Sequence, residues 1–151
     1  VAMQVRQILA IKGSALYTGT PTMTLDAAVA ALVEHDVGSL VIFDKGKMVG
    51  MLTFREVLGA LGRYGASWQR VPVSGVMRAD PVSAGPDMAI DDLRRLMLAQ
   101  RIRYLPVMEG ETLLGVISFH DVAKAVLEER TLENRMLVSY IQDVPLAAIA
   151  H

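Results

Sequence analysis

Gly115-Val116-Ile117-Ser118-Phe119-His120-Asp121 is the stretch of sequence that decides the fold. It begins as a short apolar strand, reaches a hydroxyl at Ser118, and places a carboxylate three residues later, where a helix is expected to begin. A strand end beside a helix N-terminus offers free backbone N–H groups and the positive end of the helix dipole to an anion. A hydroxyl can donate to a phosphate oxygen, and a carboxylate can accept hydrogen bonds from two sugar hydroxyls. This chemistry can hold a nucleotide, and nothing in it cleaves one.

The same design occurs earlier as Gly50-Met51-Leu52-Thr53-Phe54-Arg55-Glu56, at an offset of 65 residues (115 − 50 = 65). Shifting the chain by this offset aligns residues 23–57 with residues 88–122 without a gap. Aligned pairs include Met23 with Met88, Asp26 with Asp91, Leu40 with Leu105, and Val57 with Val122. Because chance similarity rarely holds its register over so long a span, the sequence indicates an internal duplication.

Each half is expected to contain a strand, a helix, two strands and a second helix. The first strands are expected at 16–18 and 81–83, followed by helices whose N-caps are Thr22 and Asp87. Apolar runs at 39–43 and 48–52, and again at 104–108 and 113–117, flank charged turns that contain glycine, which predicts two hairpins. Helices are expected from about Phe54 to Arg63 and from Phe119 onward, and shorter helical segments at 5–11 and 73–77 precede the halves.

These elements divide the chain into a first repeat over 5–64, a connector over 65–72, a second repeat over 73–127, and a C-terminal helix extension over 128–142. The connector is polar and is broken by glycine and proline. The extension is amphipathic, so its apolar stripe must be buried on the chain itself or on a second copy.

Composition narrows the function. The net charge is −1, which gives no strong electrostatic case for binding nucleic acid or an anionic membrane surface. The chain has no cysteine, which excludes disulfides, thiolate metal sites and a cysteine nucleophile. No apolar run of about eighteen residues and no signal-peptide pattern is present, so a soluble, cytoplasmic protein is expected. The histidines are scattered and the acidic residues do not converge, so we expect no metal site, no catalytic residues and no enzyme activity.

The chain resembles a tandem pair of CBS domains, the regulatory module named after cystathionine β-synthase, and in particular the short bacterial proteins that consist of such a pair. The motifs that carry the resemblance are Gly50-Met51-Leu52-Thr53 with Glu56, Gly115-Val116-Ile117-Ser118 with Asp121, Val37-Gly38-Ser39-Leu40, and Arg103-Tyr104-Leu105-Pro106-Val107. The resemblance implies an α+β fold of two βαββα repeats that are related by a pseudo-two-fold axis, with an extended C-terminal helix.

The resemblance also implies two clefts between the repeats, which in this family usually receive adenosine compounds. In the family motif the hydroxyl faces phosphate and the aspartate holds the ribose hydroxyls. The residues implied for the first cleft are Val37, Gly38, Ser39, Leu40, Ser118, His120 and Asp121, with Lys12 near the mouth. The residues implied for the second cleft are Thr53, Arg55, Glu56, Arg103, Tyr104, Leu105 and Pro106.

Some assignments stay open at this stage. Asp121 could simply cap the final helix, and His120 could be an exposed bystander. Glu56 stands where the motif has aspartate, and its extra methylene displaces the carboxylate, so the second cleft is expected to be the weaker or remodelled one. Arg55 could compensate by binding phosphate.

The expected function is that of a non-catalytic regulatory module that senses energy state by binding AMP, ADP or ATP, with AMP foremost and no cofactor required. The expected partners are a second copy, bound through the repeat helices and the C-terminal helix, and an unknown effector protein. One alternative is a structural dimerisation module with empty clefts. Another is a binder of NAD(H) or S-adenosylmethionine, which contain the same adenosine group.

Overall fold

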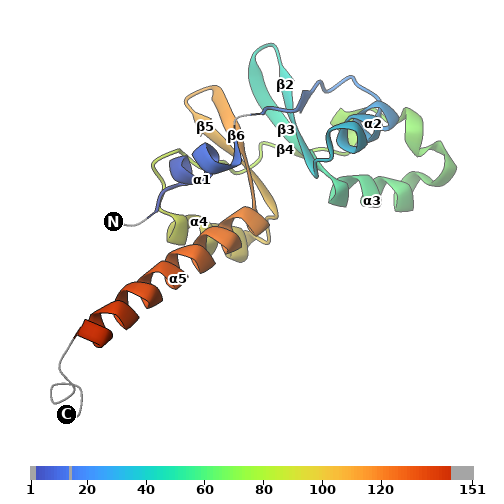
Figure 1. Cartoon of the computed structure of the whole chain (residues 1–151). Helices are drawn as coiled ribbons and strands as arrows, with labels where there is room; N and C mark the ends of the chain where they lie inside the picture. The colour runs from blue at the N-terminus through green and yellow to red at the C-terminus, as the bar shows by residue number, and fades with distance from the viewer. Residues whose placement is uncertain (1–2, 14, 144–151) are drawn as a thin grey trace.

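Apolar hairpins form the centre of each repeat. The computed structural model describes residues 3–13 and 15–143, and Figure 1 shows the two hairpins side by side at the middle of the molecule. In the first repeat, β1 (Thr18–Gly19) is followed by α2 (Leu25–His35), β2 (Ser39–Asp44), β3 (Lys47–Thr53) and α3 (Phe54–Tyr64). In the second repeat, α4 (Ile90–Gln100) is followed by β5 (Tyr104–Glu109), β6 (Thr112–Ser118) and α5 (Phe119–Asp143). Two short 3₁₀ helices, η1 (Gly65–Arg70) and η2 (Val73–Gly75), and β4 (Arg78–Ala79) connect the repeats.

The duplication extends to the strand register. β2 and β3 pair antiparallel with Ser39 opposite Thr53, and β5 and β6 pair antiparallel with Tyr104 opposite Ser118. Each hairpin is irregular at the same point, after Ile42 and after Val107. β1 and β4 extend the first hairpin into a four-stranded sheet in the order β1-β2-β3-β4. An irregularity conserved between the halves at an offset of 65 residues indicates that both hairpins have the same twist and shape.

The starts of the elements differ from the expected ones. The helices begin at Leu25 and Ile90 after Thr24 and Ala89, so the expected N-caps Thr22 and Asp87 are wrong. Thr24 and Ala89 lie in short bridges with Pro72 and Gln4, which keep the chain extended until that point. Asp87 instead accepts a hydrogen bond from Arg6 Nη2 at 2.8 Å.

The first strands are also shorter than expected. β1 begins only at Thr18, and residues 81–83 form no strand. In their place Ala84 alone forms a parallel bridge to Val107. Pro81 lacks the N–H that a strand ladder needs, which is consistent with this shorter pairing.

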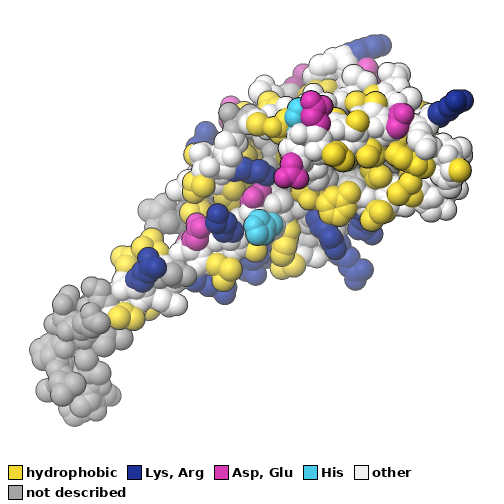
Figure 2. All heavy atoms as spheres, turned by 45° about the vertical axis from the view of Figure 1, so that its right-hand side comes forward, with side chains coloured by type: hydrophobic (Ala, Val, Ile, Leu, Met, Phe, Trp, Pro, Cys, Tyr) yellow, Lys and Arg dark blue, Asp and Glu magenta, His cyan; other side chains and the backbone are white. Residues whose placement is uncertain are grey.

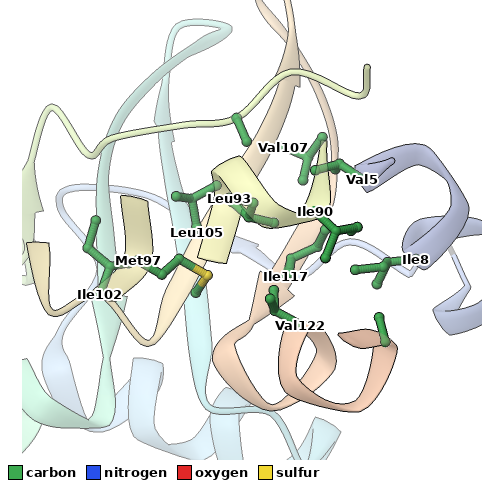
Figure 3. Close-up of a cluster of buried hydrophobic side chains, with 12 residues drawn as sticks. Val5, Ile8, Ile90, Leu93, Met97, Ile102, Leu105, Val107, Ile117 and Val122 are labelled. Carbon is green, nitrogen blue, oxygen red and sulfur yellow. The ribbon is translucent and has the colours of Figure 1, made fainter. Parts of the chain in front are cut away.

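The segments that precede the repeats pack on the opposite repeat. Val5 and Ile8 of α1 (Val5–Lys12) are buried in the core of the second repeat, and Figure 3 shows them among Ile90 and Val122. Val73 of η2 is buried in the core of the first repeat. Each core is therefore completed by a segment that belongs, in sequence, to the other half.

A third apolar cluster joins the two repeats. Val41 and Met51 of the first hairpin are buried with Leu113 of the second, and Tyr104 and Val116 pack against them. This contact brings the two hairpins together and fixes where the ends of β3 and β6 lie.

α5 is the longest helix of the described chain and runs out from the second repeat (Figure 1). Its apolar side chains Leu127, Leu132, Met136, Leu137 and Val138 are exposed. Within the part of the chain that the structure describes, none of the helices combines the length and the apolar character needed to cross a bilayer.

Candidate functional site

A cavity of about 780 Å³ lies between the repeats, at the first cleft. The end of α1, the loop between α2 and β2, and the junction of β6 with α5 form most of its wall, and the starts of α3 and β5 close it on the other side. Its lining residues are Lys12, Gly13, Ala15, Tyr17, Asp36, Val37, Gly38, Ser39, Phe54, Arg103, Tyr104, Val116, Ser118, Phe119 and His120. Since both repeats contribute, the cavity depends on how they pack together.

Ser118 and Asp121 bind each other at the N-terminus of α5. Ser118 N donates to Asp121 Oδ2 at 2.9 Å, and Asp121 N donates to Ser118 Oγ at 3.1 Å. These two bonds form a reciprocal capping box, which satisfies backbone donors at the start of the helix. Asp121 therefore caps the helix, and the same geometry fixes its carboxylate beside the cavity.

Lys12 is the partner of that carboxylate. Its Nζ donates to Asp121 Oδ2 at 2.7 Å and to the carbonyl oxygen of Val116 at 2.9 Å. Partial burial raises the pKa of Asp121, but hydrogen bonds from Lys12 and Ser118 and the charge of Lys12 outweigh it, so the pKa lies below its usual value. Asp121 is therefore ionised at neutral pH.

The aromatic side chains of the cavity are held in place by neighbours. Tyr17 stacks on His35 with ring centroids 4.5 Å apart. Phe54 meets Tyr104 edge to face at 5.9 Å. Because both rings that line the cavity rest against a second ring, they provide a fixed flat surface for an apolar or aromatic group.

The second cleft is much smaller, with a hollow of about 40 Å³. Thr53 Oγ1 donates to Glu56 Oε2 at 2.6 Å and accepts from Arg55 N at 3.2 Å. Glu56 thus turns back on the hydroxyl of its own motif. The lining residues are Met51, Thr53, Phe54, Arg55, Glu56, Arg78, Pro81, Val82, Arg101, Ile102, Arg103 and Tyr104.

The structure brings together most of the residues expected in each cleft. Lys12, Val37, Gly38, Ser39, Ser118 and His120 line the first cavity, and Asp121 reaches it through Lys12. Thr53, Arg55, Glu56, Arg103 and Tyr104 line the second hollow.

Three expected residues do not line either cleft, because Leu40, Leu105 and Pro106 point into buried positions of the strands. Arg103 and Tyr104, which were expected in the second cleft only, line both.

Sequence reasoning missed several lining residues of the first cavity, namely Gly13, Ala15, Tyr17, Asp36, Phe54, Val116 and Phe119. Phe54 and Phe119 carried a usable signal, since both directly follow the hydroxyl of the motif in each half. Asp36 carried a weaker one, because it ends α2 in the left-handed region, with φ of 51°.

Comparisons with known proteins agree with this architecture. A sequence model of the CBS domain matches residues 14–63 and 73–128. The CBS domain-containing protein YhcV of Bacillus subtilis is 33% identical over 106 residues, which are 70% of this chain and 75% of that protein. A CBS-domain containing protein of Agrobacterium tumefaciens has a crystal structure that matches with a TM-score of 0.78 and 31% identity, covering 82% of this chain and 98% of that one.

The CBS domain pair of protein MJ0100, solved in complex with 5′-methylthioadenosine and S-adenosyl-L-methionine, matches with a TM-score of 0.76. It is 21% identical and covers 85% of this chain and 99% of that one, so it shows a shared fold. Two matched domains in one α+β architecture define the class. The chain belongs to the CBS domain family and is a tandem CBS pair.

Proposed function

We propose that this CBS pair is a non-catalytic regulatory module that binds an adenosine-containing ligand in the first cleft, with AMP as the foremost candidate. The observation that carries the proposal is the cavity of about 780 Å³ into which the capped end of α5 opens. Its volume falls within the range of about 300–1,000 Å³ that is usual for small-molecule sites. MJ0100, which has the same fold, was solved with two adenosyl compounds, which supports this ligand class.

The ligand phosphate belongs at the N-terminus of α5, near Ser118 and His120. A helix N-terminus attracts anions through its free N–H groups and dipole, and a protonated histidine adds charge there. Arg103 lines the same cavity and can bind phosphate through two N–H groups at once.

The ribose hydroxyls belong on Asp121. Lys12 and the Ser118 backbone both bind Oδ2, which leaves Oδ1 as the oxygen that receives a hydroxyl. The adenine ring then lies among Tyr17, Val37 and Phe54, which present aromatic and apolar surface.

Lys12 gives the ligand a means of acting on the chain. It lies at the end of α1, so a phosphate that draws its ammonium away from Asp121 also changes how α1 is held. A ligand shifts a conformational equilibrium only if it binds the two states with different affinity, and this exchange of ion pairs would supply the difference. An effector protein that contacts α1 could then respond to the cellular AMP level.

Calorimetric titration tests the proposal. AMP, ADP, ATP, S-adenosylmethionine and NAD⁺ are titrated into the wild type, and at least one is expected to bind in the millimolar range or tighter. Asp121→Ala should weaken that binding by about 10-fold or more, because hydrogen bonds to charged groups contribute about 1.5–3 kcal/mol. Asp91→Ala, which removes an exposed carboxylate from the first turn of α4, is the control and should bind normally. If no compound binds the wild type, the module is not a sensor of this class.

A second proposal concerns assembly, in which a second copy of the chain covers the exposed apolar side chains. Phe54, Leu58 and Leu61 form a stripe at helical spacing along α3, and all three are exposed. Figure 2 shows hydrophobic side chains gathered on the side that carries the first repeat. A two-fold homodimer buries the same patch of both copies at once, and exposed α5 can extend that contact. This surface also keeps the structural alternative open, in which the dimer forms and the clefts stay empty.

A further inference from the structure

The two clefts are built from the same positions of the two repeats. Shifting the lining of the first cavity by 65 residues reproduces most of the lining of the second hollow. Paired in this way are Gly13 with Arg78, Tyr17 with Val82, Asp36 with Arg101, Val37 with Ile102, Gly38 with Arg103, Ser39 with Tyr104, Ser118 with Thr53, Phe119 with Phe54, and His120 with Arg55. The fold therefore supplies two equivalent sites, and differences between them come from side chains alone.

Four of these pairs replace a small or acidic residue by a large one. The first cleft has Gly13, Asp36, Gly38 and Ser39, where the second has three arginines and Tyr104. Each replacement adds volume at the wall of the second cleft. The hollow that remains is about 40 Å³, against about 780 Å³ for the first cavity. The smaller space holds a few water molecules at most.

Tyr104 is fixed in this position from two sides. Its ring rests edge to face on Phe54 at an interplanar angle of 83°. On its other side the hydroxyl lies so close to Gly38 that a Cβ on that glycine would collide with Tyr104 Oη. A half-buried aromatic ring held in this way cannot swing aside without losing both contacts.

We propose that Tyr104, together with Arg103, closes the second cleft to adenosine compounds, so that each chain binds a single ligand in the first cleft. The inference deepens the proposed function and rests on it. Ser39 and Gly38 hold the equivalent positions in the first cleft and leave the cavity open. Residues 103 and 104 thus determine how many ligands the CBS pair accepts.

Equilibrium dialysis with radiolabelled AMP measures the stoichiometry. The wild type is expected to bind one AMP per chain. The double variant Arg103→Gly/Tyr104→Ser gives the second cleft the residue types of the first and is expected to bind two. Tyr104→Phe keeps the ring and removes only the hydroxyl, so this matched control should still bind one. Two AMP molecules on the wild type, or one on a folded double variant, would overturn the closure.

Tyr104 also packs between the repeats, so the double variant is checked by circular dichroism and urea unfolding before dialysis. Photolabelling of the wild type with 8-azido-AMP gives a readout that needs no substitution. Labels are expected on peptides unique to the first cleft, such as residues 13–17 and 36–39, and labels on residues 78–82 would contradict the closure.

A wild type that binds no AMP contradicts the proposed function. The closure is then decided by a crystal structure of the double variant. The second cleft must open to several hundred Å³, as expected of a small-molecule pocket. A hollow that keeps its present size would show that other side chains close it.

Discussion

At the scale of single residues, the ion pair between Lys12 and Asp121 links stability to pH. The pKa of Asp121 lies below its usual value because hydrogen bonds from Lys12 and Ser118 outweigh its partial burial. A carboxyl whose pKa is lower in the folded state stabilises the fold above its unfolded pKa of about 4. That stabilisation is lost as the pH falls through the lower, folded value.

We therefore expect Asp121→Asn to lower the free energy of unfolding by about 1 kcal/mol at pH 7, since both partners are partly exposed to solvent. The difference from wild type should shrink as the pH falls below about 4, where the wild-type carboxyl becomes protonated. Urea unfolding from pH 7 to pH 3 measures it. Asp91→Asn is the control, because Asp91 is an exposed carboxylate whose nearest cation, Arg94, is 3.7 Å away. An Asp121→Asn deficit that is constant across this range would show that the ion pair contributes nothing.

At the scale of elements, α1 is a part of the second repeat's core. Leu9 lies so close to Gly115 that a Cβ there would be 2.7 Å from Leu9 Cδ2, which shows how tightly α1 packs on β6. Ile8 is 5% exposed and Ile11 is 73% exposed, so one helix offers a buried isoleucine and an exposed one.

Ile8→Ala should cost about 2–4 kcal/mol of unfolding free energy, and Ile11→Ala should cost less than about 0.5 kcal/mol. Chemical denaturation measures both. Hydrogen exchange should locate the loosening caused by Ile8→Ala in β5 and β6, with β2 and β3 protected as in wild type. Loosening confined to β2 and β3 would mean that α1 completes the first repeat instead.

Much of this element-level structure could be predicted from the sequence. The offset of 65 residues fixed both hairpins, because a gapless repeat must place its turns and motifs at equivalent points. The partner of α1 could not be predicted, since an apolar stripe on Val5 and Ile8 requires burial and does not say against which core. The orientation of Leu40, Leu105 and Pro106 was also hidden. Neighbouring strand residues face opposite sides, but these strands are apolar on both faces, so the sequence pattern did not show which side faces the cleft.

The closure of the second cleft shows the same limit at the candidate site. The sequence indicated an inferior second cleft through Glu56, whose carboxylate instead turns back on Thr53. The larger difference comes from Arg78, Arg101, Arg103 and Tyr104. These side chains come from separate segments, and their combined volume matters only because the fold brings them to one hollow.

At the scale of the whole molecule, the exposed stripe on α3 predicts the oligomeric state. The wild type should sediment as a dimer at micromolar concentration, because a two-fold contact covers Leu58 of both copies. Leu58→Glu should give a monomer, since it places two buried, unpaired carboxylates in the interface. Unfolding of the isolated monomer should change by less than about 0.5 kcal/mol, because Leu58 is 63% exposed there. Ile11→Glu, at an exposed position on α1, is the control and should remain a dimer. A monomeric wild type, or equal dissociation by both variants, would place the second copy elsewhere or remove it, and analytical ultracentrifugation distinguishes these results.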